Sequence, residues 1–314
     1  MYQRILVPLD GSDVARQVLP YAASFAKAFG AGVELIEAVS PFPRELRRSA
    51  AEAYADEHAM YPPSTEQWTE VQTEGREAAR ERLEAVAQGL RNEGLSVETT
   101  VVEGSPAESI AGSAKKVPGT LTALSTHGRS GIGRWVLGSV TDKVIRLAEA
   151  PVLVVRAGET APAPPRISNV ILPLDGSETA EAALPHAVAA AKALGASLTL
   201  LRSISPLVYG DTFADYVPAM YEDLAAEMDA EVRGYLGRMA ERARGQGVRD
   251  VEEHAVDGYA ANAILDEMGT AGDRMVVMAT HGRMGIERWV LGSVTDRVVR
   301  HGSGPVLVVH PHQQ

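Results

Sequence analysis

The sequence contains an internal duplication, and this feature limits the possible folds more than any other. The segment Ile5–Ser12 recurs in similar form as Val170–Ser177, and the nine residues Arg134–Asp142 recur without change as Arg288–Asp296. The first repeat is displaced by 165 residues and the second by 154, so the first half has 11 extra residues between its second expected strand and Gly104. Self-similarity on this scale indicates one structural unit that is present twice.

The repeats also predict where the domains begin and end. A stretch rich in proline and alanine, which ends at Pro165, separates the two copies and is typical of a semi-rigid linker. We therefore expect one domain over residues 1–156, a linker over residues 157–166 and a second domain over residues 167–314.

Each half alternates short apolar runs with longer helical patterns. In the first half, the runs that predict strands are Arg4–Leu9, Val33–Val39, Val97–Val102, Leu121–Ser125 and Val152–Val155. The helical patterns cover Val14 to Phe29, Glu66–Gly94, Pro106–Lys115 and Val140–Arg146, and the second half repeats this plan. Such alternation predicts an α/β fold with a doubly wound, five-stranded parallel sheet in each half. Ligands in that architecture bind beyond the carboxyl ends of the strands.

Composition and charge argue against several classes of function. Hydrophobic residues make up 45% of the chain and charged residues 23%, which is ordinary for a packed globular protein. The net charge of −11 disfavours nucleic acid and anionic membranes as partners, because phosphate groups require clustered Lys and Arg. Cysteine is absent, which excludes disulfides, thiolate metal sites and a cysteine nucleophile. The N-terminus does not resemble a signal peptide and no apolar run approaches the roughly 18 residues of a membrane span, so we expect a cytoplasmic protein.

The loop after the first strand of each half is the first candidate site. It consists of Pro8, Leu9, Asp10, Gly11 and Ser12 in the first half, and of Pro173, Leu174, Asp175, Gly176 and Ser177 in the second. A carboxylate at the carboxyl end of a strand can accept hydrogen bonds from a ligand or help to hold a metal ion. The alternative is that Asp10 only closes a turn and Ser12 caps the following helix.

The loop after the fourth strand is the second candidate site. In the first half it runs from His127 to Ser139 and contains four glycines, which let backbone N–H groups approach an anion closely. A helix begins at its end, and the first N–H groups of a helix favour phosphate. The alternative is a capping box, in which Ser139 caps its own helix with Asp142 three residues later. The chain has no Gly-Lys pair for a P-loop and no complete G-x-G-x-x-G dinucleotide motif.

These motifs resemble those of universal stress proteins, two of whose domains in tandem would account for essentially the whole chain. Nucleotide-binding members of that family share the pattern G-x2-G-x9-G-[S/T]. Gly128 and Gly138-Ser139 match its last three points in the first half, and Gly282 and Gly292-Ser293 match them in the second. The first glycine of the pattern is replaced by Ser125 and by Ala279. The resemblance implies a Rossmann-like fold of the adenine nucleotide alpha hydrolase type.

The resemblance also implies an adenine nucleotide ligand and a role for each matching position. The aspartates would contact the adenosine end, the backbone near Val39 and Ile204 the adenine, and the glycine loops the phosphates of ATP beside Mg²⁺ or Mn²⁺. The residues implied are Pro8, Leu9, Asp10, Val39, Gly128, Arg129, Ser130, Gly138, Ser139 and Val140, and in the second half Pro173, Leu174, Asp175, Ile204, Gly282, Arg283, Gly292, Ser293 and Val294. Because Met284 replaces the hydroxyl residue Ser130, the first half is the favoured site.

The last apolar run of each half predicts how the halves associate. Pro151–Val155 and Pro305–Val309 would be exposed edge strands unless they were paired. Universal stress proteins dimerise through such strands, so we expect the two halves to form an antiparallel pseudo-dimer within one chain. A further homodimer between chains stays open, and no motif identifies a protein partner.

Three functions remain open. The first is an ATP-binding regulatory protein of the stress response with slow or no ATP turnover. The second is an ATP-dependent hydrolase or transferase that uses the same pocket. The third is a dimerisation module without nucleotide. The first is favoured, because no general base or nucleophile occurs at a recognisable motif spacing.

Overall fold

The structure is a computed structural model that describes residues 1–39, 65–126, 137–158, 166–204, 218–280 and 291–311. In the second of these ranges side chains are described from residue 72, and in the fifth from residue 226. Among the described helices, none combines the length and the apolar character needed to cross a bilayer.

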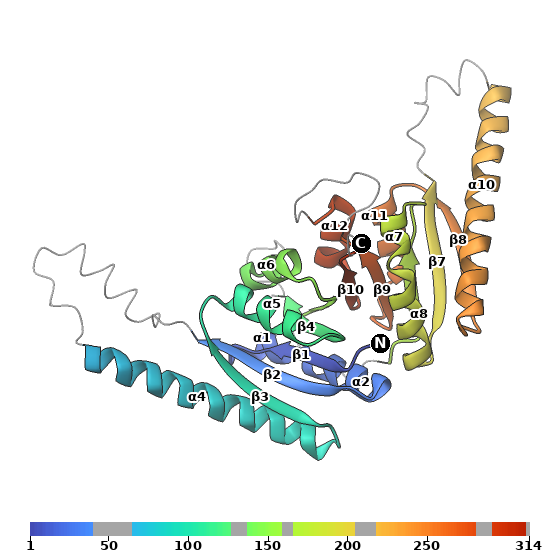
Figure 1. The fold of residues 1–314 in the computed structure, drawn as a ribbon. Helices are drawn as coiled ribbons and strands as arrows, with labels where there is room; N and C mark the ends of the chain where they lie inside the picture. Colours follow the sequence, from blue (N-terminus) through green and yellow to red (C-terminus); the bar gives the residue numbers. More distant parts are fainter. Residues whose placement is uncertain (40–64, 127–136, 159–165, 205–217, 281–290, 312–314) are drawn as a thin grey trace, which may run out of the picture.

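The described strands form one ten-stranded sheet that runs through both halves (Figure 1). The first half supplies β1 (Arg4–Pro8), β2 (Gly32–Val39), β3 (Val97–Glu103), β4 (Thr120–Thr126) and β5 (Val152–Arg156). The second half supplies β6 (Asn169–Pro173), β7 (Ser197–Ile204), β8 (Val251–Asp257), β9 (Arg274–Ala279) and β10 (Val306–Val309). Their spatial order is β3-β2-β1-β4-β5-β10-β9-β6-β7-β8.

The centre of this sheet joins the two halves. All neighbouring strands within a half are parallel, whereas β5 and β10 pair antiparallel with Leu153 opposite Leu307. The expected pseudo-dimer within one chain is therefore confirmed. Because the central pair is antiparallel, the carboxyl ends of the strands in the two halves lie at opposite edges of the sheet.

Helices cover both faces of the sheet. One face carries α1 (Asp13–Arg16), α2 (Leu19–Phe29), α4 (Thr65–Asn92), α7 (Glu178–Glu181), α8 (Leu184–Leu194) and α10 (Pro218–Gly245). The other carries α5 (Pro106–Lys116), α6 (Ser139–Leu147), α11 (Ala260–Met268) and α12 (Ser293–His301). The arrangement confirms the doubly wound α/β fold that the sequence predicts.

The core on the first face continues from one half into the other. Helices α2 and α8 pack together there, and the hydroxyl of Tyr2 lies 2.6 Å from Nδ1 of His186. Burial raises the pKa of Tyr2 above its ordinary value, so the phenol keeps its proton within this hydrogen bond. The ring of Tyr2 also meets Phe29 edge to face, at 4.9 Å between centroids. The halves are thus joined by packing as well as by the strand pair.

One local feature differs from the sequence-based expectation. The helical pattern from Val14 to Phe29 is not one helix, because α1 ends at Arg16 and α2 begins at Leu19. Pro20 lies at the start of α2 and has no N–H to continue the ladder of α1. The extra length of the first half lies in residues 40–64, which correspond to the shorter range 205–217 and fall outside the described residues.

Candidate functional site

The turn after the first strand has the same hydrogen bonds in both halves. In the first half, Oδ1 of Asp10 accepts from the backbone N–H of Ser12 at 3.0 Å and from its hydroxyl at 2.6 Å, while that hydroxyl accepts from Ala15 N at 3.1 Å. In the second half, the equivalent distances around Asp175 and Ser177 are 2.9, 2.6 and 3.1 Å. The reading in which the aspartate closes a turn and the serine caps a helix is therefore confirmed for both halves.

The turn in the first half still leaves part of the carboxylate available. Asp10 is exposed, and its second oxygen, Oδ2, makes no hydrogen bond to the described residues. The following Gly11 has φ of 81°, a conformation that favours glycine. The side chain of Arg82 on α4 lies over this glycine, since a Cβ added there would be 3.3 Å from its Cδ. A ligand at Asp10 would therefore also approach Arg82.

The helix that follows the glycine loop begins without a side-chain cap in either half. Gly138 and Gly292 are the N-cap residues, so Ser139 and Ser293 are the first helical residues. The alternative of a capping box at Ser139 is therefore wrong, because Ser139 lies one position after the N-cap. Ser139 is exposed, as is Val140, and the first-turn N–H groups have no side-chain acceptor among the described residues. This is the arrangement of a helix N-terminus that can receive an anion.

The acidic residue in that first turn is neutralised locally. Asp142 forms a two-point ion pair with Arg146, whose Nε and Nη2 donate to its two oxygens at 3.0 and 3.1 Å. Asp296 pairs with Arg300 through a single nitrogen, because Nε donates to both carboxylate oxygens, at 2.9 and 2.8 Å. The hydrogen bond to Asp142 is the main reason that the pKa of Arg146 is raised. The aspartate therefore does not oppose an anion at the helix N-terminus with an unpaired negative charge.

In the first half, a chain of contacts joins the two candidate loops. The hydroxyl of Ser125 donates to the carbonyl of Val14 on α1 at 2.6 Å, and the carbonyl of Ser125 accepts from Thr141 Oγ1 on α6 at 3.2 Å. The register of β1 against β4, extended past the strand ends, places Asp10 level with Thr126. The turn that holds Asp10 and the N-terminus of α6 thus meet at the end of β4.

The second half reproduces only part of this chain. Thr295 Oγ1 donates to the carbonyl of Ala279 at 3.1 Å, but alanine has no hydroxyl to bond to α7. The N–H of Gly292 is already bonded to the carbonyl of Thr280 at 2.8 Å. The N–H groups that could receive an anion in this half therefore begin at Ser293 rather than at Gly292.

The strand ends expected to meet adenine are also engaged by the backbone. The carbonyls of Val39 and Ile204 accept from Gly104 N at 3.1 Å and Gly258 N at 3.0 Å. A carbonyl has two lone pairs, so each can still accept one more hydrogen bond. Pro8 and Pro173 are the last residues of β1 and β6, and the buried Leu9 and Leu174 directly follow them. Val294 lies in the first turn of α12.

Five of the expected residues lie outside the described residues. They are Gly128, Arg129, Ser130, Gly282 and Arg283. Their roles stay predictions, as do the contacts of the two arginines with phosphate.

The sequence analysis does not predict the pair that lies beside each strand-one turn, an ion pair in the first half and a cation–π pair in the second. In the first half, buried Glu37 on β2 accepts from Arg82 at 2.5 Å. In the second half, the equivalent positions hold Arg202 and Tyr235, and the guanidinium lies 4.9 Å from the ring centroid. The hydroxyl of Tyr235 donates to Glu181 at 3.2 Å, and burial raises the pKa of this phenol above its ordinary value. The sequence feature that could have indicated such a pair is a charged residue, Glu37 or Arg202, within a mostly apolar strand.

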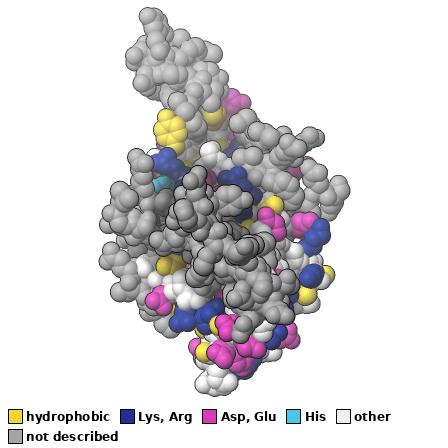
Figure 2. All heavy atoms as spheres, turned by 90° about the vertical axis from the view of Figure 1, so that its left-hand side faces the viewer, with side chains coloured by type: hydrophobic (Ala, Val, Ile, Leu, Met, Phe, Trp, Pro, Cys, Tyr) yellow, Lys and Arg dark blue, Asp and Glu magenta, His cyan; other side chains and the backbone are white. Residues whose placement is uncertain are grey.

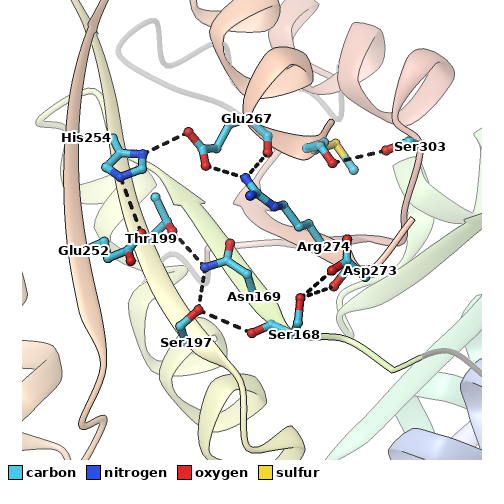
Figure 3. A network of polar contacts seen from close by, with 11 residues as sticks. Ser168, Asn169, Ser197, Thr199, Glu252, His254, Glu267, Asp273, Arg274 and Ser303 are labelled. Atoms are coloured by element: carbon cyan, nitrogen blue, oxygen red, sulfur yellow. Dashed lines mark hydrogen bonds and ion pairs between the residues drawn. The ribbon is translucent and has the colours of Figure 1, made fainter. Parts of the chain in front are cut away.

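A second polar network of the second half lies at the other edge of the sheet (Figure 3). His254 lies between Glu267, at 2.9 Å, and Glu252, at 3.5 Å, and Arg274 donates to Glu267 at 2.7 Å. Because Arg274 begins β9, this network marks the amino ends of the strands. It is therefore remote from the turn at Asp175 and belongs to the framework.

No metal centre is apparent among the described residues, where no three side chains of His, Asp or Glu gather in a way that could hold an ion. On the face drawn in Figure 2, the described acidic and basic side chains are interspersed.

Comparison with known proteins identifies the family. The model of the universal stress protein family matches this chain twice, over residues 1–156 and 166–310. This chain belongs to the universal stress protein family. A universal stress protein of Mycolicibacterium smegmatis is 28% identical over 315 residues, which cover 98% of this chain and 97% of that protein. One of Methanocaldococcus jannaschii is 32% identical over 158 residues, or 50% of this chain and 83% of that protein. The crystal structure of a universal stress protein from Archaeoglobus fulgidus superposes with a TM-score of 0.70 at 21% identity, and covers 98% of both chains.

Proposed function

We propose that this tandem universal stress protein binds ATP at the carboxyl edge of each half, with slow or no hydrolysis, and acts as a regulator in the stress response. The observation that carries the proposal is the chain of contacts in the first half. It joins the carboxylate of Asp10, through Ser125, to the uncapped N-terminus of α6. A hydrogen-bond acceptor for the nucleoside and an anion site for the phosphates are thereby held on one edge.

The first half is proposed as the tighter site. Its turn is fixed to β4 through the hydroxyl of Ser125, whereas the second half has Ala279 there and a Gly292 N–H already in use. A site whose parts are fixed before the ligand arrives loses less entropy on binding. The replacement of the family's first glycine by serine thus adds a contact, because the hydroxyl is bonded to α1.

Mg²⁺ or Mn²⁺ enters the proposal together with the nucleotide. The phosphates would supply most of its oxygen ligands, and the free Oδ2 of Asp10 can supply one more. Such an ion would neutralise part of the triphosphate charge in a chain with a net charge of −11.

Native mass spectrometry of freshly purified protein tests the proposal. We expect ATP to co-purify or to bind on addition, first to one and then to two equivalents per chain. A competition series with ADP, AMP, cAMP and dAMP would define the ligand. The last two belong in it because one solved universal stress protein is in complex with cAMP and another, from Archaeoglobus fulgidus, with dAMP.

The same experiment separates the other functions. Rapid conversion of bound ATP to ADP, or transfer of its phosphate, would replace the proposal with an enzyme that uses the same pocket. A chain that binds no nucleotide under any condition would instead be a dimerisation module, which the strand pair β5–β10 alone would explain.

A further inference from the structure

Two side chains cross from one half to the other at the ends of the central strands. Arg156 ends β5 and His310 directly follows β10, and the two positions are equivalent in the duplication. Arg156 donates from one terminal nitrogen to the carbonyls of His301 and Gly302, at 3.5 and 3.3 Å. Nε2 of His310 lies 2.7 Å from the carbonyl of Ile145, so this nitrogen carries the proton and donates it.

The acceptors of these bonds are the carboxyl ends of α12 and α6. In α6, Ala148 leaves the helix in an extended conformation, and its N–H makes the last helical bond, to Val144. The carbonyl of Ile145 thus lacks a partner within the helix, and His310 supplies one. In α12, the N–H of Gly302 likewise makes the last helical bond, to Val298, and Arg156 donates to the carbonyls of His301 and Gly302 at this end. A cation or donor at a helix carboxyl end satisfies free carbonyls and complements the helix dipole.

These are the two helices whose amino ends form the proposed phosphate sites. Each has nine residues and is about 13 Å long. Because the halves are antiparallel at β5 and β10, a helix that begins at the site of one half ends at the edge that carries the site of the other.

Backbone contacts bring each capping residue close to the site of its own half. Ala157, the neighbour of Arg156, donates to the carbonyl of Thr126 at 3.2 Å, and Thr280 donates to the carbonyl of Val309, beside His310, at 3.0 Å. Thr126 and Thr280 are the residues that enter the glycine loops. Each capping residue therefore lies beside one site and holds the helix of the other.

The two helices also lie close enough to influence each other's charges (Figure 1). The pKa of Arg146 on α6 is raised mainly by its bond to Asp142 and, to a smaller extent, by Asp296 on α12. The reciprocal effect of Asp142 on Arg300 is also present. Helices α6 and α12 therefore lie next to each other across the boundary between the halves.

We propose that Arg156 and His310 are positioning residues for the phosphate site of the opposite half: Arg156 serves the second half and His310 the first. This inference rests on the proposed function, since it concerns the same two sites. Neither side chain touches the ligand. Each fixes the carboxyl end of a helix so that the N–H groups at its amino end stay in place.

The test uses the full chain and measures each site separately. Calorimetric ATP titrations in a Gly292→Val background report the first site, and titrations in a Gly138→Val background report the second. We expect His310→Ala to weaken the first site about two- to fivefold and to leave the second unchanged, and Arg156→Ala to do the reverse. His310→Arg and Arg156→Lys should restore binding, and His310→Gln, which keeps an N–H donor, should restore part of it.

Hydrogen–deuterium exchange of the ligand-free chain tests the capping independently of nucleotide. His310→Ala should speed exchange in α6 only, and Arg156→Ala in α12 only. The proposal would be overturned if each variant weakened both sites equally, weakened only the site of its own half, or weakened neither. It would also be overturned if His310→Ala sped exchange in α12 instead of α6, or if Arg156→Ala sped it in α6 instead of α12. Absence of ATP binding by the unaltered protein would instead refute the proposed function, while the crossed exchange pattern would still report on the caps.

Discussion

The two halves have the same turn at the carboxyl ends of their strands and different polar pairs at the amino ends. At the carboxyl ends of the strands, Asp10 and Asp175 close the same turn with bond lengths that agree within 0.1 Å. At the amino ends, the first half buries an ion pair between Arg4 and Glu34, where the second has a neutral pair, Asn169 and Thr199. The strand-one turn is thus the feature that both halves retain, whereas the polar pair at the amino ends differs between them.

The divergence at the amino edge still follows a rule. Arg4 on β1 donates to the carbonyl of Ser113 at the end of α5, at 2.7 Å. In the second half, the equivalent carbonyl belongs to Glu267 and accepts from Arg274, which lies on β9. In each half a guanidinium therefore bonds a carbonyl near the end of this helix, but it comes from the first strand in one half and from the fourth strand in the other.

The first prediction concerns the buried ion pair and has the largest expected effect. Glu34→Ala leaves Arg4 without its partner in a buried position and should lower the free energy of unfolding by about 3 kcal/mol. Thr199→Val, its counterpart in the second half, removes a neutral acceptor and should cost about 1 kcal/mol. Urea unfolding followed by circular dichroism measures both. The double change Arg4→Met with Glu34→Leu is the control, and a cost above that of Glu34→Ala would contradict this explanation.

The second prediction concerns the pair beside the strand-one turn. Arg82→Ala leaves the buried carboxylate of Glu37 unpaired and should cost about 2 kcal/mol of stability. Replacing both residues by those of the second half, with Glu37→Arg and Arg82→Tyr, should recover most of this loss, because Arg202 and Tyr235 occupy the equivalent places. If the exchanged pair is less stable than Arg82→Ala alone, the two arrangements are not interchangeable.

The third prediction tests the turn that both halves contain after their first strand. Ser12→Ala and Ser177→Ala each remove a helix cap and should each cost about 1 kcal/mol. Because the two turns have the same hydrogen bonds, the two losses should agree within experimental error. Thermal unfolding of both variants measures them side by side, and a clear inequality would show that the turns are not equivalent.

The fourth prediction has the smallest expected effect on stability. Ser125→Ala removes the hydrogen bond to Val14 and should cost about 0.5 kcal/mol, since α1 is partly exposed to water. The same change should weaken ATP binding in the first half, because the turn and the phosphate helix lose a connection. Fluorescence titration with a labelled ATP analogue measures this. Unchanged affinity would remove the reason given for the tighter first site.

The sequence predicts the fold well because its signals are repeated and local. The duplicated Asp-Gly-Ser turns, the apolar strands and the helix stop at Gly30 all appear in the structure, the last with φ of 63°. The break between α1 and α2 was missed because apolar spacing continues through Pro20.

Long-range polar partners could not be predicted in the same way. Arg82 is 45 residues from Glu37, and Arg156 is 145 residues from His301, so no local pattern links either pair. The sequence also left open a capping box at Ser139, because it does not distinguish a serine cap from the glycine N-cap that the structure has. For the expected residues between 127 and 136 and between 281 and 290, the roles rest on spacing alone.

Isothermal titration of ATP into three proteins tests most directly whether the carboxyl ends of the strands in each half form a nucleotide site. They are the unaltered chain, Gly138→Val and Gly292→Val. Both glycines have negative φ, of −57° and −58°, so valine fits the backbone and places its side chain at the helix N-terminus. We predict two sites in the unaltered chain, loss of the tighter site in Gly138→Val and loss of the weaker in Gly292→Val. Binding that is absent from the unaltered chain, or unaffected by both substitutions, would contradict nucleotide sites at the carboxyl ends of the strands.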